Sequence, residues 1–179
     1  MPLLISKNDI TKMTADAIVN AANTGLRMGG GVCGAIFRAA GAEKLQEACN
    51  KLAPIKTGEA VITDGFNSNA KYIIHTAGPI YSPGNPEQEQ QLYDCYYNSL
   101  KLAAGKNLKT VAFPLISAGI YGYPTENALS TAMKSIRDFL GTFGDKITVY
   151  IVIFDSGTFS AAQKIYKDVI SSENNSFVQ

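Results

Sequence analysis

The sequence is poor in residues that several classes of protein depend on. Its 179 residues include one histidine and three cysteines (Cys33, Cys49 and Cys95), and no pair of cysteines has C-x-x-C spacing. An odd number of cysteines without such spacing predicts neither a disulfide framework nor a zinc site. We therefore expect no metal centre and no cofactor.

Charge and long apolar runs are also scarce. Charged residues make up 17% of the chain and the net charge is +1, which argues against a nucleic-acid-binding surface. No apolar run approaches the roughly 20 residues of a membrane-spanning helix. Residues 1–9 become polar too early for a signal peptide. We expect a cytoplasmic, monomeric protein that binds neither membrane nor nucleic acid.

Hydrophobic residues, at 46%, are abundant enough for a packed core. A chain of this length buries roughly two-thirds of its unfolded surface as one domain. It contains no internal repeats and no linker. We therefore expect a single domain over residues 1–172, followed by a polar C-terminal tail over residues 173–179.

Strand and helix patterns alternate along the chain. Strands are predicted at 3–5, 17–22, 59–63, 72–76, 111–116 and 148–154. Helices are predicted at 32–40, 43–51, 86–104, 124–140 and 160–171. This alternation is typical of an α/β domain with helices on both faces of a largely parallel sheet.

Two glycine loops are the most informative feature of the chain. Residues 29–34 (GGGVCG) come after the apolar strand 17–22, and residues 117–122 (SAGIYG) follow the strand 111–116. Glycine lets backbone N–H groups approach a ligand closely, and a helix that starts beside such a loop adds a partial positive charge. Together the loops predict a cleft that holds a phosphate or diphosphate from both sides.

Several segments occur in the order in which the macrodomain family has them. They are residues 9–11 (DIT), 16–23 (DAIVNAAN), 29–32 (GGGV), 39–41 (AAG), 57–60 (TGEA), 72–79 (YIIHTAGP) and 113–124 (FPLISAGIYGYP). From about residue 5 to 170 the chain resembles this family, and within it most closely the MacroD-like hydrolases. The resemblance implies a three-layer α/β/α fold with a mixed, largely parallel central sheet. It also implies binding of ADP-ribose and hydrolysis of mono-ADP-ribose from acidic side chains, and of O-acetyl-ADP-ribose.

The resemblance also implies which residues contact the ligand. They are Asp9, Ile10, Asn20, Asn23, Gly30, Gly31, Val32, Cys33, Ser117, Ala118, Gly119, Ile120, Tyr121, Gly122 and Phe154. Backbone donors of the two loops would hold the diphosphate, so that no lysine or arginine is required. The partners would be ADP-ribose and ADP-ribosylated proteins.

Two residues near the adenine each have a second interpretation. The Asp9 carboxylate can accept a hydrogen bond from the adenine amine, or it can cap a short turn, where Asp-x-Thr is common. Phe154 can stack on the base, or it can pack in the core at the end of its strand.

Two asparagines flank the strand end before the first glycine loop. Asn23 is the expected contact of the distal ribose. Asn20 lies inside an apolar strand, where a buried amide is costly unless it is hydrogen-bonded. It is therefore either a ligand contact or a structural residue that pins the loop. His75, within the segment 72–79, is expected to be a satisfied structural residue.

The catalytic residues implied are Asn23, Gly31 and Cys33, and Cys33 is where the chain departs from its relatives. MacroD-like enzymes usually have aspartate there, and histidine where this chain has Phe37. That aspartate orients a water, so here the ligand's own phosphate would have to position it. A nucleophilic Cys33 would need a base, and His75 lies at the end of another strand. Hydrolase and non-catalytic reader of ADP-ribose both remain open.

Overall fold

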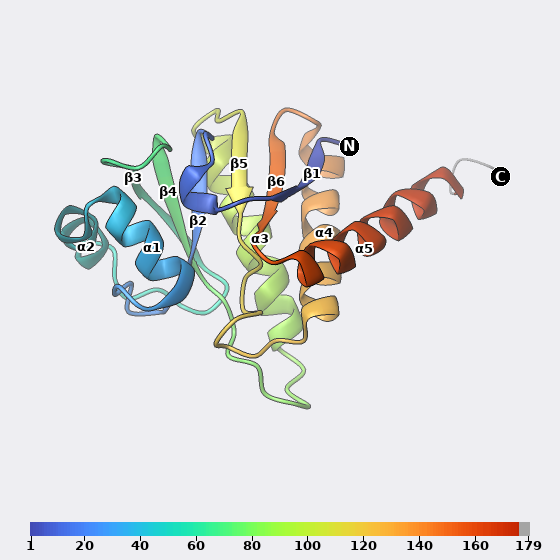
Figure 1. Ribbon diagram of the computed structural model, residues 1–179, viewed down its shortest axis with the longest axis horizontal. Helices are drawn as coiled ribbons and strands as arrows, with labels where there is room; N and C mark the ends of the chain where they lie inside the picture. The colour runs from blue at the N-terminus through green and yellow to red at the C-terminus, as the bar shows by residue number, and fades with distance from the viewer. Residues whose placement is uncertain (176–179) are drawn as a thin grey trace.

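The computed structural model describes residues 1–175 and has one six-stranded sheet at its centre (Figure 1). The strands are β1 (Leu3–Lys7), β2 (Ala17–Ala22), β3 (Ala60–Asp64), β4 (Tyr72–Ala77), β5 (Thr110–Phe113) and β6 (Thr148–Ile153). Their order is β1-β6-β5-β2-β4-β3, and every neighbouring pair is parallel except β3 with β4. The expected mixed, largely parallel sheet is confirmed.

Helices cover both faces of this sheet, as the three-layer fold requires. The helices are α1 (Gly31–Ala40), α2 (Ala42–Asn50), α3 (Gln88–Gly105), α4 (Thr125–Phe143) and α5 (Ser156–Asn175), with a short 3-10 helix, η1 (Ile10–Lys12). Figure 1 shows α1 in front of the sheet and α3 and α4 behind it. α5 packs on β1 and α4, and its far end projects from the domain. No helix within residues 1–175 is long and apolar enough to cross a membrane.

The core consists of two apolar clusters, one on each face of the sheet. Ile18 on β2 belongs to the cluster beneath α1 and α2, and Val19 belongs to the cluster beneath α3 and α4. Successive side chains of a strand point to opposite faces. A strand that is covered on both sides therefore needs apolar residues at consecutive positions, which is why 17–22 reads as one apolar run.

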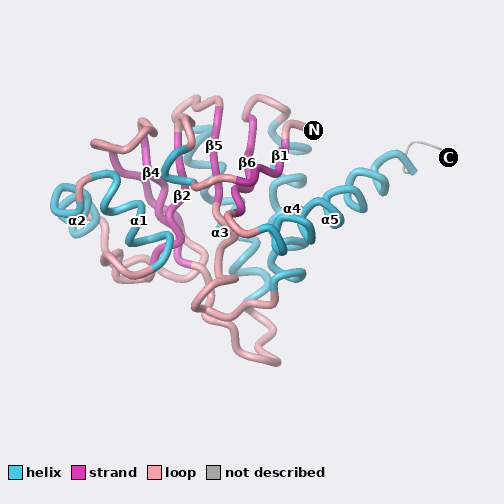
Figure 2. The backbone as a smooth tube through the Cα atoms, viewed as in Figure 1, coloured by secondary structure: helices cyan, strands magenta, loops and turns pink. Residues whose placement is uncertain are grey.

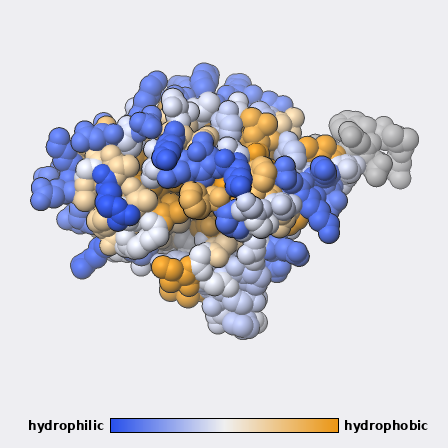
Figure 3. All heavy atoms as spheres, viewed as in Figure 1, coloured by the Kyte–Doolittle hydropathy of each residue, from blue (hydrophilic) through white to orange (hydrophobic). Residues whose placement is uncertain are grey.

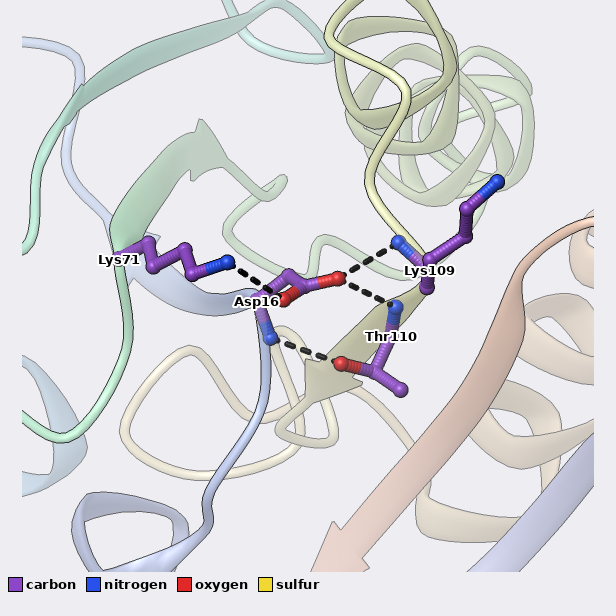
Figure 4. Close-up of polar contacts among 4 residues, drawn as sticks. All are labelled: Asp16, Lys71, Lys109 and Thr110. Atoms are coloured by element: carbon purple, nitrogen blue, oxygen red, sulfur yellow. Dashed lines mark hydrogen bonds and ion pairs between the residues drawn. The ribbon is translucent and has the colours of Figure 1, made fainter.

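One carboxylate, that of Asp16, joins segments at the amino end of the sheet, and Figure 4 shows its polar contacts. Asp16 Oδ2 accepts hydrogen bonds from the backbone N–H groups of Lys109 (2.7 Å) and Thr110 (3.3 Å). The Asp16 N–H donates to Thr110 Oγ1 at 2.8 Å, and Lys71 Nζ lies 3.6 Å from Asp16 Oδ1. The pKa of Asp16 is lowered by the hydrogen bonds to its carboxylate, first by that from the Lys109 N–H and then by that from the Thr110 N–H. They join the starts of β2 and β5.

Most expected boundaries differ from the structure by about one to four residues, and two of the larger differences have a clear physical cause. The strand predicted at 111–116 ends at Phe113, because Pro114 has no N–H for the sheet. The Tyr96 hydroxyl replaces the lost pairing: it donates to the Pro114 carbonyl (3.3 Å) and accepts from the Ile116 N–H (3.0 Å).

The last helix starts at Ser156 rather than at residue 160. The side chain of Asp155 accepts from the Thr158 N–H at 2.8 Å and so caps it. The helix continues to Asn175, into the segment expected to be a polar tail. Residues 176–179 of that segment lie outside the described part of the chain.

Candidate functional site

A groove runs along the carboxyl edge of the sheet, where the loops gather below the strands in Figure 2. It consists of two cavities, of about 420 Å³ and about 380 Å³. They meet at a waist lined by residues common to both: Gly31, Val32, Pro114, Leu115 and Gly119. The waist therefore lies between the start of α1 and the loop after β5. Open α/β sheets bind their ligands at this edge.

The first glycine loop brings the start of α1 to the waist. Gly31 begins α1 with a φ of +55°, a left-handed conformation that favours glycine. A Cβ on Gly30 or Gly31 would meet no atom within 4 Å, so their backbones face open space. The first N–H groups of a helix have no acceptor within the helix, and the helix dipole makes this end partially positive. The arrangement can bind an anion without a charged side chain.

The second glycine loop forms the opposite wall. Ser117 has a φ of +66° and Gly122 one of +69°. The turn is closed by hydrogen bonds from the Gly122 N–H to the Gly119 carbonyl (3.0 Å) and from the Tyr123 N–H to the Ser117 carbonyl (2.9 Å). The Ser117 hydroxyl, which lines the larger cavity, is buried and has no partner among the described residues. A Cβ on Gly78, at the end of β4, would collide with that hydroxyl.

The smaller cavity has an exposed aromatic ring at its side. Phe154 lies just past β6 and is 79% exposed, so the core-packing interpretation of this residue is wrong. Ile120, which lines the larger cavity, is 89% exposed. Figure 3 shows hydrophobic side chains in the middle of this face, surrounded by hydrophilic ones. Such a surface suits a flat, partly apolar ligand group.

Asp9 caps η1 and also lines the smaller cavity. Its Oδ1 accepts hydrogen bonds from the Thr11 hydroxyl (2.7 Å) and the Thr11 N–H (2.9 Å). These bonds stabilise the charged carboxylate and lower the pKa of Asp9. The capping interpretation is thus confirmed, and Oδ2 has no bond in the cap. Asp155, which sequence reasoning missed, also lines this cavity, and its only signal was the Asp-x-x-Thr pattern of a helix cap.

The structure gives Asn23 both a place in the groove and the loop-pinning role considered for Asn20, and it keeps Asn20 away from the groove. Asn23 lines the larger cavity, but it also pins the loop: its Nδ2 donates to the Arg27 carbonyl (2.8 Å) and its Oδ1 accepts from the Arg27 N–H (3.0 Å). Asn20 is only 1% exposed and lies in the lining of neither cavity. Its Nδ2 donates to His75 Nδ1 at 3.0 Å.

His75 is a buried structural residue between β2 and β3, as its sequence context predicted. Its second ring nitrogen lies 3.0 Å from the Thr63 hydroxyl. Because burial disfavours the charged imidazolium, the pKa of His75 falls to about 4. The hydrogen bond from Asn20 to Nδ1 places the ring proton on Nε2.

Cys33 lies in the first turn of α1 and lines the larger cavity. Its Sγ is 3.8 Å from the Arg27 carbonyl oxygen. Neither cavity is lined by a histidine, lysine or arginine among the described residues, so the thiol has no neighbouring base or cation there. Residues 1–175 contain no cluster of three or more His, Cys, Asp or Glu side chains that could hold a metal ion.

The other expected contact residues lie around the groove as follows. The larger cavity is lined by Gly30, Ile120 and Tyr121, the smaller by Ile10 and Ala118, and Gly122 closes the second turn. Tyr123, just past this turn, is buried and packs edge-on against Tyr81 at 5.3 Å between ring centroids.

Known proteins are similar to this chain in sequence and in fold. The family model described as Macro domain matches residues 19–132. The ADP-ribose glycohydrolase MACROD2 of Xenopus laevis is 48% identical over 164 residues, which cover 90% of this chain and 38% of that protein. The O-acetyl-ADP-ribose deacetylase of Escherichia fergusonii is 45% identical over 155 residues, covering 84% of this chain and 87% of that protein.

Solved structures agree with the sequence relatives. The Oceanobacillus iheyensis macrodomain with ADP has a TM-score of 0.90 and 42% identity, covering 94% of this chain and 91% of that one. The Trypanosoma brucei macrodomain in complex with ADP-ribose has a TM-score of 0.84 and 34% identity, covering 90% of this chain and 68% of that one. These solved macrodomains share the α/β/α fold of this chain. This chain belongs to the Macro domain family.

Proposed function

We propose that the groove binds ADP-ribose across both cavities. The adenine lies in the smaller cavity, against Phe154 and the free oxygen of Asp9. The diphosphate lies at the waist and the distal ribose in the larger cavity, beside Asn23. The observation that supports this most is the waist itself, where two glycine loops face each other across a connection between two chambers. The relatives solved with ADP and ADP-ribose support the same ligand.

The described residues that line the groove include no lysine, arginine or histidine, and this fits backbone recognition of the diphosphate. Gly31 and its neighbours at the start of α1 supply N–H donors from one side, and the loop 117–122 supplies them from the other. The unpartnered Ser117 hydroxyl is a further donor for a polar ligand. Asn23 keeps one amide hydrogen beyond the one bound to the Arg27 carbonyl, and this hydrogen is available to a ribose hydroxyl.

We further propose that the protein hydrolyses esters of ADP-ribose. A water positioned by the ligand's own phosphate attacks the ester that joins the distal ribose to an aspartate or glutamate. The bond between ribose and carboxylate breaks, and free ADP-ribose and the unmodified acidic side chain are released. O-acetyl-ADP-ribose offers the same ester chemistry. The named activities of two relatives, a glycohydrolase and a deacetylase, support this class of reaction.

A reader module that binds ADP-ribose without turnover is the second candidate. The observation that favours it is Cys33, which places a thiol beside a carbonyl oxygen at the point where a carboxylate would orient water. In that case the groove holds the ligand but leaves the ester intact.

Incubation with a protein that carries mono-ADP-ribose on glutamate or aspartate distinguishes the two. Intact mass spectrometry should show loss of one ADP-ribosyl mass, and the Asn23→Ala variant should lose this activity. A modified protein that is retained but not cleaved would establish the reader. Failure to bind ADP-ribose would overturn both candidates.

A further inference from the structure

The turn between Asn23 and the first glycine loop is held by two side-chain amides from opposite sides. One is that of Asn23, which binds the N–H and the carbonyl of Arg27. The other is that of Gln46, on α2. Its Oε1 accepts from the Met28 N–H at 2.9 Å, and its Nε2 donates to the Leu26 carbonyl at 3.0 Å. Four consecutive polar groups of the backbone are thus bound by two side chains.

This turn needs such support because its backbone is strained. Leu26 has a φ of +51°, a left-handed conformation that is costly for a residue with a branched side chain. Its side chain is nevertheless only 1% exposed and belongs to the core beneath α1 and α2. A conformation of this kind persists only where the surroundings determine it. Gln46 binds the Leu26 carbonyl itself and the N–H two residues later.

We propose that Gln46 is a positioning residue for the groove, although it lines neither of its two cavities. It fixes the turn 24–28, and through the turn it fixes both the Asn23 amide and the start of the glycine loop at Gly29. Gln46 is itself held, because its Nε2 also donates to Asn50 Oδ1 at 2.9 Å. The ligand named in this proposal rests on the proposed function. The positioning of the turn by Gln46 rests only on the contacts described above.

The two bonds at position 46 need a donor and an acceptor side by side, and the glutamine amide supplies both. Gln46→Met has nearly the same length and helix propensity but makes neither bond. Gln46→Glu can accept from the Met28 N–H but cannot donate to the Leu26 carbonyl. Lys44→Met, at an exposed position of the same helix, is the matched control.

The functional test compares two ligands. ADP-ribose reaches the larger cavity beside Asn23, whereas AMP lacks the second phosphate and the distal ribose. Gln46→Met should weaken ADP-ribose binding by about ten-fold. A change of this size corresponds to the net free energy of about one hydrogen bond. It should leave AMP binding within about two-fold, a difference below the free energy of one hydrogen bond. Lys44→Met should change neither.

The geometric test is amide hydrogen exchange in the ligand-free protein. The Met28 N–H should exchange faster in Gln46→Met and close to the wild-type rate in Gln46→Glu. This result is independent of any ligand, so a wild-type protein that binds no ADP-ribose would overturn the proposed function and not the positioning role. The proposal would be overturned if Gln46→Met weakened binding of both ligands equally. It would also be overturned if Gln46→Met and Lys44→Met had the same ADP-ribose affinity and the same Met28 exchange rate.

Discussion

At the residue scale, Cys33 places a thiol at the position where a carboxylate would orient the attacking water. Cys33→Asp should raise hydrolysis of protein-linked ADP-ribose by about ten-fold or more, within the range of general-base contributions. An aspartate in the first turn of α1 is also favoured by the helix dipole. Single-turnover release of ADP-ribose is the appropriate measurement, because it separates chemistry from product dissociation.

Two further variants define the contribution of the thiol. Cys33→Ala should change the single-turnover rate only slightly, since the ligand's phosphate positions the water. Asn23→Ala should be far more damaging, because it removes both a ribose contact and the hydrogen bonds to Arg27 that hold the loop. If Cys33→Ala abolished turnover while ADP-ribose still bound, the thiol would take part in the reaction and the phosphate-assisted mechanism would be wrong.

Asp9 combines a capping bond with a free carboxylate oxygen, and the two roles can be separated. Asp9→Ala should weaken ADP-ribose binding by about 1–3 kcal/mol, the usual effect of removing a charged hydrogen-bond partner. Asp9→Asn keeps its one oxygen for the Thr11 N–H and presents the amide nitrogen, a donor, to the adenine. Calorimetry should therefore find Asp9→Asn weakened as well. Wild-type affinity in both variants would mean that Asp9 only caps η1.

At the scale of elements, His75 couples β4 to its neighbours β2 and β3 and should make their stability depend on pH. Its pKa is lowered on folding from 6.5 to about 4. Below pH 6.5 the unfolded chain therefore binds a proton that the folded chain does not, and stability falls as the pH falls toward about 4. Urea denaturation should give a free energy of unfolding about 2 kcal/mol smaller at about pH 5 than at about pH 7.

The control for this prediction is His75→Asn, which keeps an acceptor for the Asn20 amide but does not titrate. It should be less stable than the wild type at every pH, with little change between the same two conditions. Carboxylates such as Asp16 have lowered pKa values, so their loss of stability occurs at lower pH. A wild-type protein as stable at about pH 5 as at about pH 7 would contradict the assignment of His75 as a neutral buried residue.

Most elements could be predicted from the sequence because their apolar periodicity has a direct physical cause. The run 17–22 is a strand covered on both faces, and its bounds are those expected. Most boundaries shifted by a few residues, and in two of the larger shifts a single residue was decisive. Pro114 ends β5 early, and Asp155 caps α5 a turn before its apolar pattern begins.

The candidate site was predictable in its loops but not in its side-chain partners. The glycine loops predict a backbone-lined cleft, because each follows an apolar strand and glycine lets backbone N–H groups approach a ligand closely. Asn23 pins the loop because its amide reaches Arg27, whereas the amide of Asn20 reaches His75. The pattern of apolar residues along the chain does not predict these distances. The contact of Gln46 with the same turn comes from another helix and has no local signal.

At the scale of the whole molecule, the account depends on one groove that acts as a unit. The helix start at Gly31 and the turn at Gly119 both line its waist, which the two cavities share. A ligand that fills both chambers gains contacts from the ends of five strands, β1, β2, β4, β5 and β6. A ligand that fills only the smaller one gains stacking and the Asp9 contact but little from the first glycine loop.

Calorimetric comparison of ADP-ribose with AMP tests this claim most directly. ADP-ribose should bind with micromolar affinity or better, roughly −8 kcal/mol or more favourable. AMP should bind much more weakly, because it lacks the second phosphate at the waist and the ribose beside Asn23. Equal affinity for the two ligands would contradict the two-loop groove.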